Sequence, residues 1–599
     1  MSSPAGPPKV EEQSIPGASE AESKESQETT ITTVSSSHGI RFWLVFIALC
    51  FCVLLSALDL GGVGTAAPTI VADLHGSDFS WVGSAYTLSS AAFLPLSGNL
   101  AQIFGRRLIT LGAILVFAIG SAVSGSARSM TVLIVGRAIQ GVGGGGTQAL
   151  VYIITADLIP LRERGLFNGI TGMIWTVGSI AGPFIAGALA QKATWRWLFY
   201  LNLPLCALAF ASVALFLDVA TPDGGILEKL AAVDWIGNIL IIASSTSCML
   251  GLTWGGGRFS WSSPQVLAPL IIGLCGLALS VVYELTIARR PTIPKSVISN
   301  RGSLLGYVAT FLHGVVAISV TFYMPTWFQA VRDATPIQSG LYFLPMAAAI
   351  SPAAILEGII IAKMGHYRLV NFTGWATLIL GLGLFISLHR TTALGPIIVF
   401  QLIQGVGMGL LYATTFVVLA PLSVSENASA ISLLTFVRTF AQSWGIAIAG
   451  SIIQNKLSKS LPTSITEQFN SPADLVYGVI PEIAYMPEPL KSQVQDAFVD
   501  SMRLSWIVLA ALCGAGLLTV FFVKDIPLSR QVDKKWGLVE KQAKEDTELD
   551  EKQLPNAAPV EDSTRRNSEV AGSPSLSVDR PALARVHLYF YLESLHRSR

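Results

Sequence analysis

The amino-acid sequence predicts an all-α membrane protein in which two helices are inserted between two pseudo-symmetric six-helix bundles. Three observations predict this fold class. The chain of 599 residues is 51% hydrophobic and only 13% charged, whereas soluble domains carry about 25% charged residues. Apolar segments of about twenty residues recur along the chain, each long enough to cross roughly 30 Å of hydrocarbon as a helix. The third observation is an internal repeat.

The internal repeat is clearest in two glycine-rich stretches. Gly136–Gly146 reads GRAIQGVGGGG, and its core IQGVG returns 264 positions later within Phe400–Gly409. Upstream of each copy, GNLAQIFGRR at 98–107 and GIIIAKMGHYR at 358–368 share the same spacing of two glycines. Downstream lie matching glycine pairs, Gly182 with Gly187 and Gly445 with Gly450. These three pairs of similar stretches occur in the same order and are separated by nearly the same number of residues, which indicates two related halves. Such an organisation is typical of secondary transporters.

Fourteen apolar segments are predicted to span the membrane, with both chain ends in the cytosol. Eleven basic residues in the predicted inner loops against six in the outer loops support this orientation. The repeat aligns the first six segments with the last six and leaves the seventh and eighth as an insert. The segments are 42–66, 79–99, 108–127, 130–152, 167–190, 197–217, 234–254, 266–287, 303–325, 340–362, 370–389, 395–419, 429–453 and 504–523.

This arrangement divides the chain into five parts. Both ends are polar and lack an apolar period, so we expect them to be disordered. The aromatic run at 585–599 predicts an interfacial helix, with an accident of gene modelling as the alternative. The parts are a disordered cytosolic N-tail (1–40), an N-terminal six-helix bundle (41–217), a linker with two extra transmembrane helices (218–300), a C-terminal six-helix bundle (301–525) with an outer loop (456–503), and a disordered cytosolic C-tail (526–599).

Several function classes lack their sequence features. The glycine run after Gln140 is followed by neither Lys-Ser nor Lys-Thr, so it is not a P-loop, and any energy source is expected to be an ion gradient. No metal-ligand spacing, HExxH or GxSxG occurs, which argues against an enzyme. The net charge of +1 gives no indication about nucleic acid, and the lack of a basic stripe with interleaved aromatics argues against such a partner. All six cysteines lie in apolar runs and are expected to pack in the core.

Ionisable residues within spanning segments are costly and therefore functional candidates. Asp59 and Arg137 are predicted to lie in the outer half of the membrane, within roughly 10 Å in depth, where they could pair directly or through water. Such a pair either couples transport to protons or locks two helices together. His313 lies near the midplane and is either a proton site or a lone packed histidine.

Three further charged residues are predicted to be satisfied locally. Arg438 lies near the middle of segment 429–453 with no acidic residue level with it, so Gln442 or helix carbonyls are expected to bind it. Glu357 and Glu284 lie close to cytosolic helix ends, where their carboxylates can snorkel into water. These two acids are therefore interpreted as mainly structural.

Six motifs occur in order along residues 40–525. They are LDLGGVGTAAP at 58–68, GNLAQIFGRR at 98–107, GRAIQGVGGGG at 136–146, VGSIAGPFIAG at 177–187, WRWLFYLNLP at 195–204 and FYMPTWFQAVRDATPIQSG at 322–340. Together they resemble the motifs of the major facilitator superfamily, and within it the fourteen-helix drug:proton antiporters of the fungal multidrug and toxin efflux type. The resemblance implies the major facilitator fold.

The resemblance also implies roles for particular residues. Arg137 would couple proton and substrate binding, with Asp59 as its protonatable partner. Helices one, four, nine and twelve would line the cavity and place His313 beside that pair. The remaining cavity residues would be Gln140, Gln401, Gln404 and Arg438. The gating motifs would use Gly98, Gly105, Arg106 and Arg107 as a cytosolic latch and Gly178, Gly182, Pro183 and Gly187 as a bend. Gln102 replaces the acidic residue of the family's latch, which weakens it or rebuilds it with an amide hydrogen bond.

The resulting function prediction is a proton-coupled exporter of small amphipathic compounds such as drugs, toxins or secondary metabolites. Its partners would be the small-molecule substrate, protons and the lipid bilayer, without a cofactor, and we expect a monomer. The expected location is the plasma membrane, with the vacuolar membrane as the alternative. One competing prediction is a fourteen-helix carrier of siderophore–iron chelates or of vacuolar basic amino acids. Another is a transporter-like membrane sensor.

Overall fold

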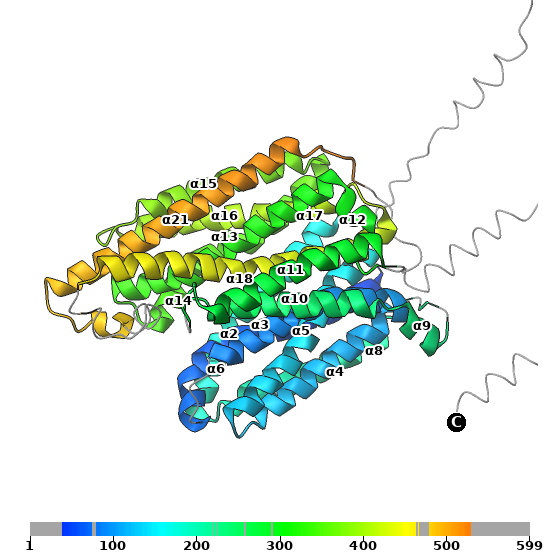
Figure 1. The fold of residues 1–599 in the computed structure, drawn as a ribbon, viewed down its shortest axis with the longest axis horizontal. Helices are drawn as coiled ribbons and strands as arrows, with labels where there is room; N and C mark the ends of the chain where they lie inside the picture. Colours follow the sequence, from blue (N-terminus) through cyan, green and yellow to red (C-terminus); the bar gives the residue numbers. More distant parts are fainter. Residues whose placement is uncertain are drawn as a thin grey trace, which may run out of the picture. The chain divides into compact units, whose positions relative to one another are not determined.

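The computed structural model describes residues 39–528 except for the gaps at 75–79, 220, 223, 257–258, 289–290, 463–464 and 466–478. The named elements are all helices (Figure 1). In the described ranges no strand forms, and Gly255 and Phe259 make one isolated bridge. The run at 585–599 and nearly all of both predicted tails lie outside the described residues.

The first predicted bundle corresponds to long helices joined by short turns. Gly105, with a φ of 95°, separates the second and third of these helices, because a positive φ suits glycine best. Ser129 accepts the backbone N–H of Val132 at 3.4 Å and caps the fourth helix. The elements are α2 (Ile40–Leu74), α3 (Ser80–Phe104), α4 (Arg106–Gly125), α5 (Met130–Leu158), α6 (Arg164–Lys192), α7 (Arg196–Tyr200) and α8 (Asn202–Phe216).

The linker and the second predicted bundle follow the same pattern. Thr335 and Gln338 form a capping box at the start of α14, and Gly365 ends that helix with a φ of 74°. The linker elements are α9 (Ile226–Ala232), α10 (Trp235–Trp254), α11 (Pro264–Thr286) and α12 (Lys295–Ser299). The later elements are α13 (Arg301–Arg332), α14 (Pro336–Met364), α15 (Arg368–Ile386), α16 (Leu394–Leu410), η1 (Leu411–Ala413), α17 (Thr414–Leu419), η2 (Val424–Glu426), α18 (Asn427–Ser460) and α21 (Leu490–Phe522).

The last helix differs from its prediction. The sequence predicts a span over 504–523 after an outer loop, but α21 begins at Leu490. One face of this added stretch is apolar, since Val494, Ala497 and Phe498 are buried. The described part of segment 456–503 is therefore largely helical at both ends.

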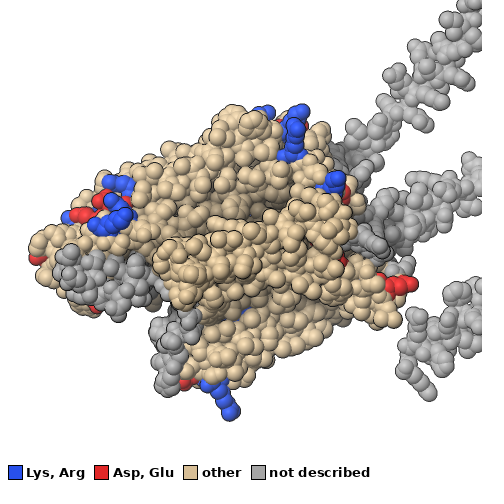
Figure 2. Space-filling model, in the orientation of Figure 1, with Lys and Arg blue, Asp and Glu red and all other residues tan. Residues whose placement is uncertain are grey.

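Twelve helices of the described chain are long and apolar enough to cross a membrane. The two other predicted segments correspond to α3 and α5, which are 25 and 29 residues long but are not among the twelve. On the face in Figure 2, charged side chains gather near the helix ends, and the surface over α18 and α10 shows none. These features identify a multi-pass membrane protein.

The two copies of IQGVG make equivalent helix contacts. Gly141 and Gly145 press α5 against α3 so closely that a Cβ atom at either would lie 2.3 or 2.2 Å from a backbone oxygen. Gly405 and Gly409 press α16 against α14, where a Cβ would lie 2.5 or 2.3 Å from a backbone oxygen. Only glycine permits such close approaches between helices. The repeated sequence therefore forms the same kind of helix–helix contact in both halves.

The first half packs mainly against helices α14 and α18 of the second. Helix α6 packs against α14, and both α3 and α5 pack against α18. Helix α10 contacts both α3 and α18, and these three lie side by side in Figure 1. The linker helix thus covers one of the two seams between the halves.

Candidate functional site

A buried ion pair joins the first and fourth predicted spans. Arg137 Nη1 of α5 lies 2.5 Å from Asp59 Oδ2 of α2, and both side chains are 0% exposed. Of the two predicted arrangements, direct or through water, the structure contains the direct one. Tyr86 places its ring 4.5 Å from the guanidinium carbon, and the backbone oxygen of Val82 accepts from Arg137 Nε at 3.1 Å. The arginine is therefore held on several sides.

Two amides complete what we call the Asp59 cluster (Asp59, Arg137, Gln140 and Asn202). Gln140 Nε2 and Asn202 Nδ2 both donate to Asp59 Oδ1, at 2.8 and 2.9 Å. Gln140 Oε1 accepts from Arg137 at 2.6 Å. The carboxylate thus receives one hydrogen bond from a cation and two from amides. A cavity of ≈ 10 Å³ adjoins Asp59, Asn202 and Gly182.

Sequence reasoning did not assign Asn202 to this cluster. It lies in the WRWLFYLNLP motif at 195–204, which is interpreted from the sequence only as a feature of the superfamily. The signal was present, because Asn202 is the one amide in an otherwise apolar run that forms α8. Ser121 of α4 was also missed, and its hydroxyl accepts from Gln140 at 2.9 Å.

A second polar group lies in the other half and is called the Arg438 cluster (His313, Tyr412 and Arg438). The guanidinium carbon of Arg438 lies 4.7 Å from the centre of the Tyr412 ring. His313 meets the same ring edge-on, with centroids 5.9 Å apart. Neither ring nitrogen of His313 has a hydrogen-bond partner, and Arg438 Nε and Nη2 have none. Gln442, the expected partner of Arg438, is exposed and makes no such bond.

Gln401 and Gln404 lie apart from both clusters. Gln401 donates to the backbone oxygen of Tyr342 in α14 at 2.9 Å. Gln404 faces α15, where a Cβ on Gly381 would lie 2.2 Å from its Oε1. In the repeat these glutamines correspond to Arg137 and Gln140. In the described part of the chain, no hydrogen bond joins either glutamine to the Asp59 cluster or to the Arg438 cluster.

The predicted cytosolic latch forms a network of its own. Arg106 Nε donates to Asp157 Oδ2 at 2.9 Å, in a pair with side chains only 1% and 7% exposed. Arg107 donates to the backbone oxygen of Ala214. Gln102 Nε2 donates to Ser429 Oγ of α18 at 2.8 Å. The rebuilt amide version of the latch is therefore the one present, and it joins the two halves.

The contact of α3 with α18 depends on a glycine. A Cβ on Gly98 would lie 2.5 Å from Ser432 Oγ, and that hydroxyl donates to the backbone oxygen of Leu94 at 3.1 Å. This close approach lies beside the bond between Gln102 and Ser429. Together these contacts close one seam between the halves at the predicted cytosolic end.

Helix α6 carries the predicted bend and forms the other seam. Gly178 packs against Ala57 of α2, at 2.7 Å for an added Cβ, and Gly182 lies beside Gly62. Thr176 Oγ1 lies 2.9 Å from Ser351 Oγ of α14. The side chain of Pro183 and the surroundings of Gly187 lie outside the described residues, although both positions are helical.

Glu357 is placed differently from its interpretation. Its side chain does not snorkel, because the residue is only 1% exposed and its Oε1 has no hydrogen-bond partner. It precedes Gly358, whose added Cβ would lie 2.2 Å from Gly165 of α6. Glu284 is also buried, at 4% exposed. Burial of both carboxyl groups excludes the snorkelling interpretation.

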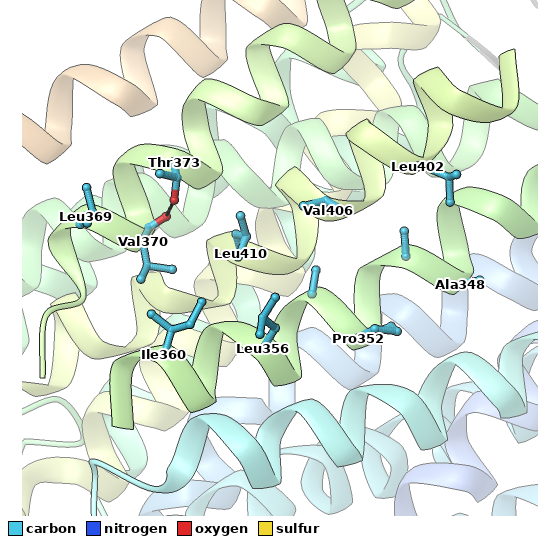
Figure 3. Close-up of a pocket in the computed structure, with 12 residues that line it drawn as sticks. Ala348, Pro352, Leu356, Ile360, Leu369, Val370, Thr373, Leu402, Val406 and Leu410 are labelled. Atoms are coloured by element: carbon cyan, nitrogen blue, oxygen red, sulfur yellow. Dashed lines mark hydrogen bonds between the residues drawn. The ribbon is translucent and has the colours of Figure 1, made fainter. Parts of the chain in front are cut away.

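A groove of ≈ 590 Å³ lies between α14, α15 and α16 (Figure 3). Its walls are apolar, with Leu356 from α14 and Val406 from α16 among the exposed lining residues. Thr373 is the only polar side chain drawn, and its hydroxyl donates to the backbone oxygen of Val370 at 2.9 Å. The groove is separate from both polar clusters and offers a ligand only apolar surface.

A multi-helix membrane protein with a buried ion pair between its helices has the construction of a secondary transporter. Comparison with known families agrees: the Major Facilitator Superfamily matches residues 49–446. The chain belongs to this superfamily. The fold class is therefore the all-helical major facilitator fold.

The relatives are fungal transporters of the same superfamily. The chain is 36% identical over 517 residues to the efflux pump FUS6 of Gibberella moniliformis, covering 84% of this chain and 92% of that pump. It is 39% identical over 524 residues to the MFS-type transporter ucsD of Acremonium, covering 86% and 89%. It is 35% identical over 512 residues to the acurin A biosynthesis cluster transporter of Aspergillus aculeatus, covering 84% and 92%.

Proposed function

We propose that this chain is a proton-coupled secondary transporter that exports small amphipathic compounds, such as drugs, toxins or secondary metabolites, by alternating access. The observation that carries the proposal is the Asp59 cluster, in which a fully buried carboxylate is paired with a fully buried arginine. The resemblance to fungal efflux pumps supports the direction of transport and the class of substrate.

The Asp59 cluster can couple protons to movement. An ionised Asp59 holds Arg137 and two amides, whereas a protonated carboxyl group loses the charge that orders them. Proton binding would then release Arg137, and a change in the helix contacts would follow. His313 would act as a second proton site, and the substrate cavity would include Gln140, Gln401, Gln404 and Arg438.

The gates would lie where the halves meet. The cytosolic latch would consist of Gly98, Gly105, Arg106 and Arg107, and the outer bend of Gly178, Gly182, Pro183 and Gly187. In the described ranges, the hydrogen bonds between the halves lie at the predicted cytosolic end or near the middle of the helices, as Gln102–Ser429 and Thr176–Ser351 illustrate. This distribution supports a state that is closed to the cytosol.

The proposed topology has fourteen spans, so α3 and α5 would cross the membrane as well. Both lie between other helices, α3 against α5, α10 and α18, and a span shielded by protein can be less apolar than one facing lipid. Helices α10 and α11 would form the insert between the two bundles. We place the transporter in the plasma membrane, as a monomer without a cofactor.

The test is the exchange of Asp59 for asparagine. Asp59→Asn keeps the shape of the side chain but removes the proton-binding carboxylate, so it should abolish substrate accumulation driven by an imposed proton gradient in liposomes. Substrate binding to the purified variant should remain largely intact. The matched control is Asp500→Asn, which makes the same change at an exposed position paired only with Arg503 three residues on. The proposal fails if the Asp59→Asn protein still accumulates substrate at the wild-type rate.

A further inference from the structure

The Arg438 cluster contains a positive charge that no acidic residue balances. No carboxylate of the described chain forms an ion pair with Arg438, whose Nε and Nη2 are buried without a hydrogen-bond partner. An unpaired arginine inside a membrane-spanning bundle is costly. Arg137 differs, because Asp59 balances it. A ligand that supplies the missing negative charge would remove this cost.

The surroundings of Arg438 suit a flat anionic group. Tyr412 lies against the guanidinium at 4.7 Å, a cation–π arrangement that orients the guanidinium plane. The fork of an arginine can bind a carboxylate through two parallel hydrogen bonds. His313 is only 4% exposed and meets the same tyrosine ring edge-on. It therefore helps to fix the ring against which the guanidinium lies.

The cluster also lies at the junction of the two halves. Ser432 bonds to Leu94 across the α3–α18 seam, and Arg438 follows Ser432 by six residues, about 9 Å along a helix. Tyr152 of α5 interacts electrostatically with both Tyr412 and Arg438. Arg438 is half-buried and its Nε and Nη2 atoms are covered, so a molecule between the halves would reach these two atoms when the surrounding helices move.

From this geometry we propose that the Arg438 cluster binds the acid group of an anionic amphipathic substrate, an organic carboxylate in its ionised form. Two guanidinium N–H groups hold the carboxylate oxygens, and Tyr412 holds the guanidinium in place. The proposal rests on the export function above and narrows its substrate class to organic acids.

The experiment measures binding to the purified full-length protein in lipid nanodiscs. The probes share one fluorescent apolar body: dansylglycine with a carboxylate, its neutral carboxamide, and dansyl-ethylenediamine with a cationic amine. The wild type should bind the carboxylate most tightly. Arg438→Gln should weaken carboxylate binding about tenfold or more and leave the carboxamide unchanged. Arg438→Lys should recover part of the loss, since an ammonium keeps the charge without the fork.

Arg128→Gln is the matched control, because it removes the same charge from an exposed position and should change no affinity. The proposal is overturned if the wild type binds the amine or the carboxamide as tightly as the carboxylate. An equal loss of all three probes in Arg438→Gln would also overturn it, and would assign Arg438 to holding Tyr412. Failure of proton-driven export in liposomes with selective carboxylate binding intact would reject the transport mechanism and leave this assignment standing.

Discussion

A buried ion pair is most sensitive to losing one partner. In Arg137→Gln the Asp59 carboxylate would remain 0% exposed without its cation, so we expect a loss of about 3–5 kcal/mol in the free energy of unfolding. The double variant Asp59→Asn/Arg137→Gln, which leaves no unpaired charge, should recover most of that loss. Thermal unfolding in detergent measures both. Additive losses in the double variant would contradict the coupling of the two residues.

The stability of Arg137→Gln should also depend on pH. A lone buried carboxylate can lose its charge by taking up a proton, so the deficit should shrink as the pH falls. The double variant has neither charge and should show the same stability difference from wild type across that range. Unfolding curves at several pH values measure this, and a deficit that is constant with pH would mean that Asp59 is not the group left unpaired.

At the residue scale, the sequence shows which polar residues lie within membrane-spanning helices better than it shows which residues they contact. An acid and an arginine at similar depth in apolar helices are visible in the sequence. That depth leaves direct pairing and pairing through water open, and the structure contains the direct contact of Asp59 with Arg137. Asn202 was missed because depth along one helix does not say which neighbouring helix a side chain faces. Glu357 was misplaced for a related reason, since nearness to a helix end does not show whether another helix covers the side chain.

At the element scale, glycines set how closely the helices approach. Gly145→Ala and Gly409→Ala would place a Cβ 2.2 or 2.3 Å from a backbone oxygen, and such overpacking should cost about 1–3 kcal/mol each. Gly112→Ala and Gly383→Ala are matched controls in α4 and α15, because nothing lies within 4 Å of the added atom. These controls should be neutral or stabilising by up to about 1 kcal/mol. Thermal unfolding of the four variants tests this, and similar values for both pairs would refute the close-packing role.

Helix positions are more predictable than helix ends or lipid exposure. Each predicted apolar segment corresponds to one helix or to consecutive helical elements. A run of about twenty apolar residues has the length and composition of a membrane-spanning helix. The ends differ where a helix continues beyond the apolar run: α2 reaches Leu74 rather than 66, and α21 begins at Leu490. The extension of α21 buries Val494, Ala497 and Phe498 against other helices, and a hydropathy pattern does not contain such contacts.

At the scale of the whole molecule, the repeat predicts the two related halves but not the contacts between them. Offsets near 262 residues identify equivalent helices, and the glycine contacts of α5 and α16 follow that equivalence. The seams do share one equivalent contact, since the repeated Gly98 and Gly358 allow α3 to approach α18 and α14 to approach α6. The hydrogen bonds across them, such as Gln102 with Ser429, have no counterpart in the other half. The grouping of the polar residues into two separate clusters is also a property of the assembled bundle, so no spacing in the sequence predicts it.

The proposed alternating access requires the seam between α3 and α18 to open and close. Gln102 and Ser429 join the halves at 2.8 Å, so a covalent link between these positions should trap the state closed to the cytosol. In Gln102→Cys/Ser429→Cys, with the exposed Cys275 changed to serine, a short bifunctional thiol reagent that reduction can cleave should abolish proton-driven transport in liposomes. Reduction should restore transport. The matched control is Gln329→Cys/Ser339→Cys, whose native side chains lie 3.0 Å apart within the second half and need not separate. If the linked Gln102→Cys/Ser429→Cys protein transports as fast as the reduced one, this seam does not open during the cycle.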